Sequence, residues 1–569
     1  MAVPILLSPT AADSAAVKND SASNAATYTQ PAHQQTTSVI NEESVFWMSL
    51  SSDERYLLPK LEQLMEELQY STRQVKSFRI SNTQDISNLT SNRPLHKLKQ
   101  VFQCLSQRQS SATCRTELFI KMSLQTESFQ NLLESALESG AFSRLVVKGD
   151  YWTVAMEEKT MECITRALKK GNLQQVQFVG MYMPLDATEV LQDCLQCSGM
   201  DAAASGISLQ FCRIHFEDAS PLMDGLAAGK LPIHSLSVVE CHWDDAKAGL
   251  LVRALTKRLD SSDTLLARLS LAGNSLGAVT LNGIAEHLQH PACKLQHLNL
   301  SRQTSVDMAD LICGNDSILL KALSTNQSLK SLHLTDLALL GRHVQAMFDN
   351  INSHVCGNDS RIQDLNLANN LIESMADVWH ASSKQQRNTS LKSLDLSGNA
   401  FWKNTTSVKS PCEERDVLSD MTHCFPHLHY LGKEVELGVE MEQGRNSGCD
   451  DISSQYWAQL QYNLDMNRAG RCLFTASLPL SLVPIALERA NKVLVAAPHN
   501  DTGSDVVPYE NSDAAPSGRQ YFGCQPNSTT ACSSSSSPGH VRMMSRSASA
   551  VYGMIQGLIA EHMGSSGVR

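Results

Sequence analysis

Apolar residues in the middle of the chain recur in a short frame that returns many times. The clearest copies run from Leu266 to Asn274, from Ile362 to Asn370 and from Leu391 to Asn399. Each copy begins with Leu or Ile, has Leu at its fourth and sixth positions, and ends with Asn at its ninth position. The last two apolar positions lie two residues apart, so they face the same side of a short strand. The segments between copies carry apolar residues at helical spacing. The pattern therefore predicts a repeated strand–helix unit.

The same frame continues in both directions with substitutions. Candidate strands begin near Val75, Leu118, Phe142, Leu173, Gly206, Ile233, Leu266, Leu295, Leu329, Ile362, Leu391 and Phe425. Their average spacing is about 32 residues. A unit of this size buries too little apolar surface to fold alone, so neighbouring units are expected to stack. At the end of each frame, an Asn such as Asn399 is expected to bond backbone groups that the turn leaves unpaired.

The frame resembles that of leucine-rich-repeat proteins. The long unit with a full helix resembles the ribonuclease-inhibitor-like subclass, which is found inside cells. The resemblance runs from Val75 to Tyr430, over 60% of the chain, and is strongest from Leu266 to Asn399. It implies an α/β leucine-rich-repeat solenoid, a horseshoe of about 10–12 strand–helix repeats, with helical caps and disordered tails.

Composition divides the remainder of the chain into segments. The expected order is a disordered N-terminal tail (1–40), a capping helix (52–74), the solenoid (75–437), a polar linker (440–454), a helical C-terminal element (455–495), a disordered Ser-rich insertion (496–541) and a short C-terminal helix (549–562). The Ser-rich insertion has too few apolar residues to order itself.

The C-terminal element carries two resemblances. Asn467-Arg-Ala-Gly-Arg471, followed by an apolar segment bounded by prolines, is similar to a tail of diatom and algal leucine-rich-repeat proteins, although Met466 replaces a Leu. The run from Trp457 to Arg471, followed by Leu478-Pro-Leu480, loosely resembles a SOCS-type box that docks elongin and cullin. The cysteine of such a box is missing, and Leu464 lies nearest to its place. Packing of this element against the last repeat is the simpler interpretation.

Charge and composition narrow the class of partner. A net charge of −11 gives no electrostatic case for nucleic acid or for an anionic membrane. No signal peptide or membrane-spanning segment is apparent, so a monomeric cytoplasmic protein is expected, with the nucleus as the alternative compartment. The 16 cysteines are expected to be free thiols.

Metal and catalytic chemistry are not predicted. Cys194, Cys197, Cys212 and His215 have a zinc-like spacing, but the frame puts the first two on a helix and Cys212 on a strand of the opposite wall. The cluster of His423, Cys424, His427 and His429 is interpreted as an exposed turn. No nucleophile elbow or phosphate loop occurs, so neither enzymatic activity nor a cofactor is expected.

Protein or peptide binding is the predicted function, because a repeat stack presents one wide curved sheet. The outward mid-strand positions predicted to form this surface are Gln210, Ser237, Ser270, Asn299, His333, Asn366 and Asp395, with Phe119 and Val146 as an apolar anchor. Two alternatives stay open. Some proteins of this subclass activate Ran-type GTPases through an arginine, for which Arg79 and Arg144 are the candidates. The other alternative is a substrate adaptor of a cullin-type ubiquitin ligase, acting through the C-terminal element.

Overall fold

The computed structural model describes the chain in stretches that follow the repeats. They are residues 45–48, 54–70, 75, 77–80, 93–108, 116–122, 127–150, 152–197, 206–259, 265–305, 307–314, 316–352, 362–375, 390–402, 412–425, 427–433, 435, 460–461, 463–465 and 467–468. The chain divides into two units, Met1–Ser44 and Val45–Arg569, and all described residues belong to the second. The predicted segments 1–40, 440–454, 496–541 and 549–562 lie outside the described residues.

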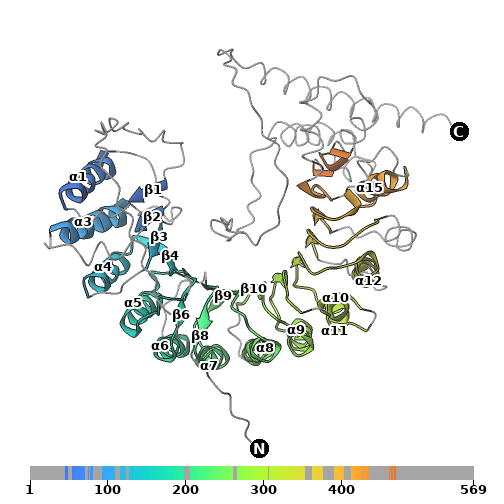
Figure 1. The fold of residues 1–569 in the computed structure, drawn as a ribbon, viewed down its shortest axis with the longest axis horizontal. Helices are drawn as coiled ribbons and strands as arrows, with labels where there is room; N and C mark the ends of the chain where they lie inside the picture. Colours follow the sequence, from blue (N-terminus) through green and yellow to red (C-terminus); the bar gives the residue numbers. More distant parts are fainter. Residues whose placement is uncertain are drawn as a thin grey trace, which may run out of the picture. The chain divides into compact units, whose positions relative to one another are not determined.

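One parallel sheet of twelve strands runs through the described residues, and its strands follow one another in chain order. They are β1 (Val45–Met48), β2 (Ser77–Ile80), β3 (Thr116–Lys121), β4 (Phe142–Lys148), β5 (Gln175–Val179), β7 (Ile207–Cys212), β9 (Ile233–Val239), β10 (Arg268–Ser270), β11 (His297–Asn299), β12 (Ser331–His333), β13 (Asp364–Asn366) and β14 (Ser393–Asp395). The short strands β6 (Tyr182–Met183) and β8 (His215–Phe216) pair separately. Figure 1 shows the main sheet on the inner side of the curved repeat stack.

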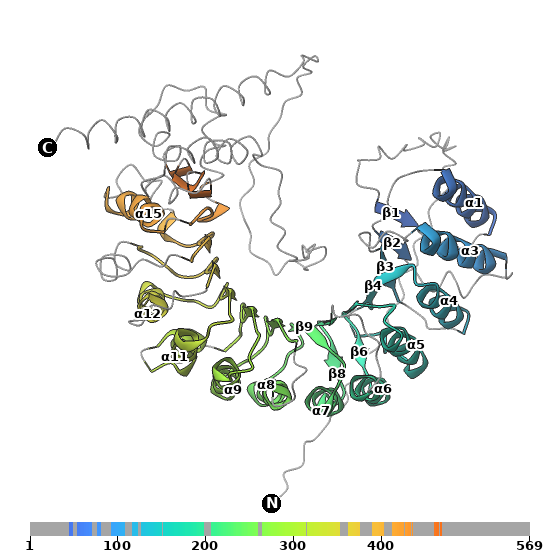
Figure 2. The same cartoon turned by 180° about the vertical axis from the view of Figure 1, so that it is seen from behind.

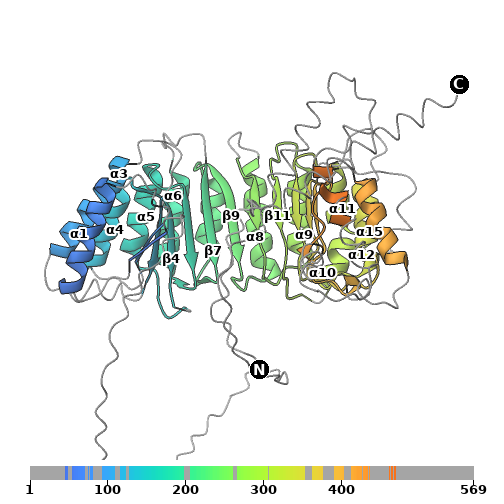
Figure 3. The same ribbon diagram turned by 90° about the horizontal axis from the view of Figure 1, so that it is seen from above.

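Helices connect most of the successive strands in the described stretches and form the outer layer of the same unit (Figures 1 and 2). They are α1 (Glu54–Tyr70), α3 (Arg93–Arg108), α4 (Glu127–Glu138), α5 (Glu158–Lys169), α6 (Leu185–Gln196), α7 (Ser220–Ala228), α8 (Asp245–Leu259), α9 (Ala278–Gln289), α10 (Met308–Cys313), α11 (Ile318–Thr325), α12 (Gly341–Asn352) and α15 (Cys412–Cys424). Figure 3 shows β4, β7, β9 and β11 following one another in this order along the sheet, with helices behind them. The fold is an α/β leucine-rich-repeat solenoid, as the sequence predicts.

The core lies between the sheet and the helices, where the inward residues of the frame stack from repeat to repeat. Leu269 is paired in register with Leu298, and Leu298 with Leu332. Further along, Leu365 is paired with Leu394. All five side chains are buried. Because side chains alternate along a strand, the neighbouring residues point to the opposite, inner face.

The asparagines that end the frame bond the turn backbone as expected. The Nδ2 of Asn370 donates to the carbonyls of Leu334, Leu367 and Ala368, and its Oδ1 accepts from Leu337 N and Leu339 N. Each asparagine thereby ties its own turn to the preceding repeat.

Asn274 and Asn399 make equivalent bonds. In the copy that begins at Leu295, which lacks the asparagine, the Nε2 of Gln303 donates to the carbonyls of Leu271, Leu300 and Ser301. A longer amide therefore fills the same role, which the frame did not predict.

The ends of the sheet differ from the predicted pattern. Strand β1 precedes α1 and pairs in parallel with β2, so the sheet begins one strand earlier than the pattern indicates. At the other end, the predicted strand near Phe425 is reduced to an isolated bridge between Ser393 and Tyr430. The other eleven candidate strands each coincide with a strand of the main sheet.

Described residues of the C-terminal element contact the last repeat. Leu460 and Leu464 are buried. The Nδ2 of Asn467 donates to the carbonyls of Thr422 and Phe425, at the carboxyl end of α15. Carbonyls at the end of a helix are commonly bonded from outside it, and Asn467 supplies such bonds from later in the chain.

Candidate functional site on the concave sheet

The sheet register brings the predicted binding residues into one continuous row, which we call the concave row. Neighbouring strands pair Phe119 with Val146, Val146 with Gln177, and Gln177 with Gln210. The row then continues through Ser237, Ser270, Asn299, His333, Asn366 and Asp395, one residue on each strand from β9 to β14. Residues about 30 apart in sequence thus become nearest neighbours on one surface.

Side chains in the concave row differ in how much surface they offer. Most of them are half-buried, but Val146 is only 6% exposed and Gln177 only 9%. Outward side chains converge on the inner face of a curved sheet, so a middle position can be covered by its neighbours. Val146 therefore adds little to the predicted apolar anchor, and Phe119 is its main exposed member.

Both arginines considered for GTPase activation lie near the N-terminal end of the concave row, Arg79 on β2 and Arg144 on β4. The guanidinium of Arg79 lies over the ring of Phe119, 5.2 Å from the ring centre. Such a cation–π contact stabilises both side chains. The Nε of Arg144 lies 2.9 Å from Glu117 Oε2 in an ion pair across β3 and β4. Both arginines thus contact partners within the sheet itself.

The C-terminal part of the row has a repeated local hydrogen bond. The side-chain oxygens of Asn299, Asn366 and Asp395 each accept from the backbone N–H two residues later, at 3.0 Å. The side chains therefore fold toward the carboxyl edge of the sheet. Because a backbone N–H can only donate, these bonds also fix which end of each Asn amide faces it.

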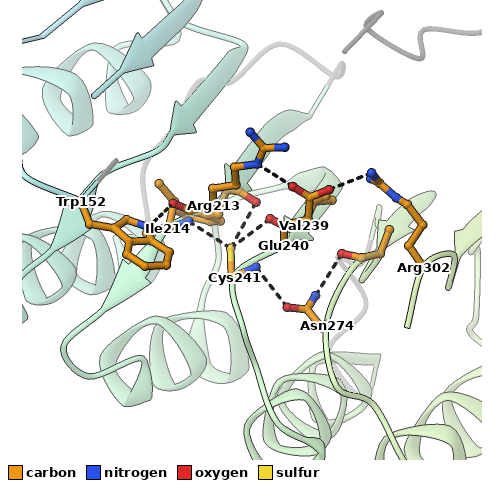
Figure 4. Close-up of polar contacts among 10 residues, drawn as sticks. Trp152, Arg213, Ile214, Val239, Glu240, Cys241, Asn274 and Arg302 are labelled. Carbon is orange, nitrogen blue, oxygen red and sulfur yellow. Dashed lines mark hydrogen bonds and ion pairs between the residues drawn. The ribbon is translucent and has the colours of Figure 1, made fainter. Parts of the chain in front are cut away.

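A row of charged residues borders the concave face at the turns that follow β7, β9 and β11. Glu240 lies between two guanidinium groups, with its carboxylate 2.6 Å from Arg213 Nε and 2.7 Å from Arg302 Nη1 (Figure 4). Among these turns, Gly273 lies between Glu240 and Arg302. A Cβ at position 273 would lie 2.5 Å from Glu240 Cγ. The missing side chain of Gly273 therefore leaves room for the second ion pair.

These turn residues adopt the left-handed conformation, which favours glycine. Arg213, Glu240 and Arg302 have φ angles of 54°, 53° and 57°. The nearby Trp152, with φ 63°, donates from its ring Nε1 to Arg213 O at 2.7 Å (Figure 4). Sequence reasoning missed this row. The available signal was that Glu240 and Arg302 stand where other copies have Gly273 or Gly398.

The residues with zinc-like spacing occupy different layers. Cys194 is buried on α6, where its Sγ lies 3.7 Å from Thr165 O of the neighbouring helix. Burial raises the pKa of Cys194 to about 12, so the thiol stays protonated. The ring of His215, which is exposed, stacks on Tyr182. Among the described residues, no group of three or more His, Cys, Asp or Glu could hold a metal ion.

No helix in the described stretches has the length and apolarity needed to cross a membrane.

Comparison with known proteins supports the repeat class but not a named family. No family model matches the chain. A stretch of 139 residues, 24% of the chain, is 31% identical to NACHT, LRR and PYD domains-containing protein 3 of Rattus norvegicus. That stretch covers 12% of the rat protein, so the chain matches only a small part of it.

Among solved structures, the crystal structure of the TLR13–ssRNA13 complex is similar over 57% of this chain and 36% of that one. The sequence identity is 16% and the TM-score is 0.30, so this similarity carries no argument about function.

Proposed function

We propose that this protein is a non-enzymatic scaffold that binds a protein or peptide on the concave face of its sheet. The observation that carries the proposal is the continuous register of the concave row, from Phe119 on β3 to Asp395 on β14. A row of polar side chains held on a rigid sheet suits recognition, because little conformational freedom is lost on binding. The partial similarity to a protein with an LRR in its name is consistent with this role.

The ribonuclease-inhibitor-like subclass and the algal type of tail stay predictions, as do a monomeric state and a cytoplasmic location. The subclass is favoured by a helix in most of the described repeats. The adaptor alternative assigns the C-terminal element to elongin and cullin binding. The burial of Leu464 and the hydrogen bond from Asn467 to Thr422 O favour another role, in which this element packs on the last repeat. A partner set containing elongin and cullin would favour the adaptor, and a GTPase would favour the activator.

Substitutions in the concave row are expected to weaken binding of the natural partner without changing stability. The partner is first identified by affinity purification of the full-length chain. Asn366→Trp and His333→Trp should then each reduce affinity about tenfold or more, because they add bulk within the contact surface. Melting temperatures should stay close to that of the wild type, since these side chains contribute little to the core.

The matched control introduces the same bulk on the outer layer. Leu250 is 50% exposed on α8, and Leu250→Trp should leave partner affinity unchanged. Deletion of residues 496–540 should also have no effect. If that deletion abolished binding while the concave substitutions left it intact, recognition would reside in the tail and the proposal would be wrong.

A further inference from the structure

Exposed charge on the C-terminal half of the concave face has one sign. Arg268 on β10 is exposed, as are Lys330 and Lys392, which immediately precede β12 and β14. All three are cationic near neutral pH. They occur in a protein whose net charge is −11, so this region differs in sign from the molecule as a whole.

Two carboxylates of the same region are partly buried, and that of Asp395 is also hydrogen-bonded. Asp395 Oδ1 accepts from the backbone N–H of Ser397 and, at 2.6 Å, from its hydroxyl. Asp364 is half-buried, and burial raises its pKa, although His429, His333 and Lys392 around it act in the opposite direction. Neither carboxylate is as exposed as the three cations.

Hydrogen-bond donors accompany these cations on the same strands. The Oδ1 atoms of Asn299 and Asn366 face the strand-end N–H groups, so each amide presents its NH₂ group on the other side. Asn366 Oδ1 also accepts from Thr335 Oγ1 at 2.9 Å. The described part of the chain supplies no acceptor for either NH₂ group. A ligand that matches this surface must bring acceptors.

The imidazoles on this face contribute donors rather than fixed charge at neutral pH. Burial, with Arg268, His333, Lys330 and His234 nearby, lowers the pKa of His297 to about 4. Burial also lowers the pKa of His333, against the effect of Asp364 and Asp395. Burial likewise lowers the pKa of His429, and the charges of Arg468 and Lys392 act in the same direction. The hydrogen bond to His427 O and the charge of Asp364 raise this pKa, but their effect is smaller. The fixed positive charge therefore comes from the three cations.

We infer that the concave face of β10–β14 binds an acidic peptide segment. The carboxylates of the peptide pair with Arg268, Lys330 and Lys392. They also accept hydrogen bonds from the side-chain amides of Asn299 and Asn366. The inference rests on the proposed function and specifies the chemistry of the partner. Complementary charge mainly raises the rate of association and selects among partners, while hydrogen bonds to the fixed amides add to affinity.

The test uses fluorescein-labelled decaglutamate and the full-length protein near neutral pH at low ionic strength. Fluorescence anisotropy should show binding to the wild type, weakened by added salt. Decaglutamine, of equal length without charge, should not bind. The triple variant R268E/K330E/K392E should bind decaglutamate at least about tenfold more weakly, because each substitution replaces attraction by repulsion.

A control triple variant reverses the same total charge on the outer helices. Lys159 on α5, Lys257 on α8 and Lys321 on α11 are exposed, and K159E/K257E/K321E should change affinity by less than about twofold. Circular dichroism melts check that both triple variants are folded. If the glutamate variant does not fold, R268Q/K330Q/K392Q replaces it, with the same direction expected.

Two results would overturn the inference: no binding of decaglutamate to the wild type, or equal loss in both triple variants. If Asn366→Trp and His333→Trp still weakened binding of the natural partner, either of these two results would reject only the acidic-peptide site. The proposed function would then remain supported. Conversely, decaglutamate binding with no effect of Asn366→Trp or His333→Trp on the natural partner would reject the proposed function and keep the acidic-peptide site.

Discussion

Replacing Leu394 by alanine is expected to lower the free energy of unfolding by about 2–5 kcal/mol. Leu394 is fully buried on β14 and stacks in register with Leu365 of the preceding repeat. Alanine would remove apolar contacts and leave a cavity that neighbouring repeats fill only in part. Denaturant unfolding followed by circular dichroism measures the change.

The adjacent residue provides the control for Leu394. Ser393 lies on the same strand with its side chain on the opposite, half-exposed face. Ser393→Ala should change stability by less than about 0.5 kcal/mol. Equal effects of the two substitutions would mean that the inward and outward faces of β14 have been assigned wrongly.

Asn370→Ala is expected to destabilise the protein by about 3 kcal/mol or more, although only one small side chain changes. The Asn370 amide is 3% exposed and satisfies three carbonyls and two backbone N–H groups. Each buried backbone group left without a partner costs about 1–3 kcal/mol. Water that enters the space left by the amide would recover part of this cost.

Unfolding of Asn370→Ala is best compared with that of Asn131→Ala. Asn131 is exposed on α4, so its loss should cost less than about 0.5 kcal/mol. A cost for Asn370→Ala no larger than for this control would show that its hydrogen bonds do not hold neighbouring turns together.

Most of the strand positions could be predicted from sequence because the frame is local. Two apolar residues two positions apart, as at Leu394 and Leu396, determine which face of a strand is buried. Sheet order then follows, because each repeat can stack only on the next one. The same reasoning placed one residue of the concave row on each strand, and the register pairs these residues from strand to strand. It missed β1, since the segment before α1 carries no copy of the frame.

Contacts between repeats were beyond sequence reasoning because they join residues about 30 positions apart. Asp245, at the start of α8, accepts from Gly277 N, Val279 N and Thr280 N at the start of α9. Burial would raise the pKa of Asp245, but the hydrogen bonds from Thr280, Val279 and Gly277 hold it below its usual value. One repeat thus caps the helix of the next, and no local motif marks the pair.

The charged side chains of the candidate site show the same limit. The sequence indicates that Arg268, Lys330 and Lys392 lie on or beside strands, but not that the Asp395 carboxylate near them accepts hydrogen bonds from Ser397. The ion pairs of Glu240 with Arg213 and Arg302 likewise depend on Gly273 between them. Both features follow from the register of stacked repeats, which brings together side chains that no single frame contains.

Site-specific photo-crosslinking identifies the surface of the protein that contacts the partner. A photoreactive amino acid is placed at Ser270 in the concave row, or at Lys257 on the outer helix α8, and the protein is irradiated with its purified partner. Recognition by the concave sheet predicts a crosslinked adduct from position 270 and none from position 257, since only the former lies in the contact surface. An adduct from position 257 with none from position 270 would contradict recognition by the concave sheet.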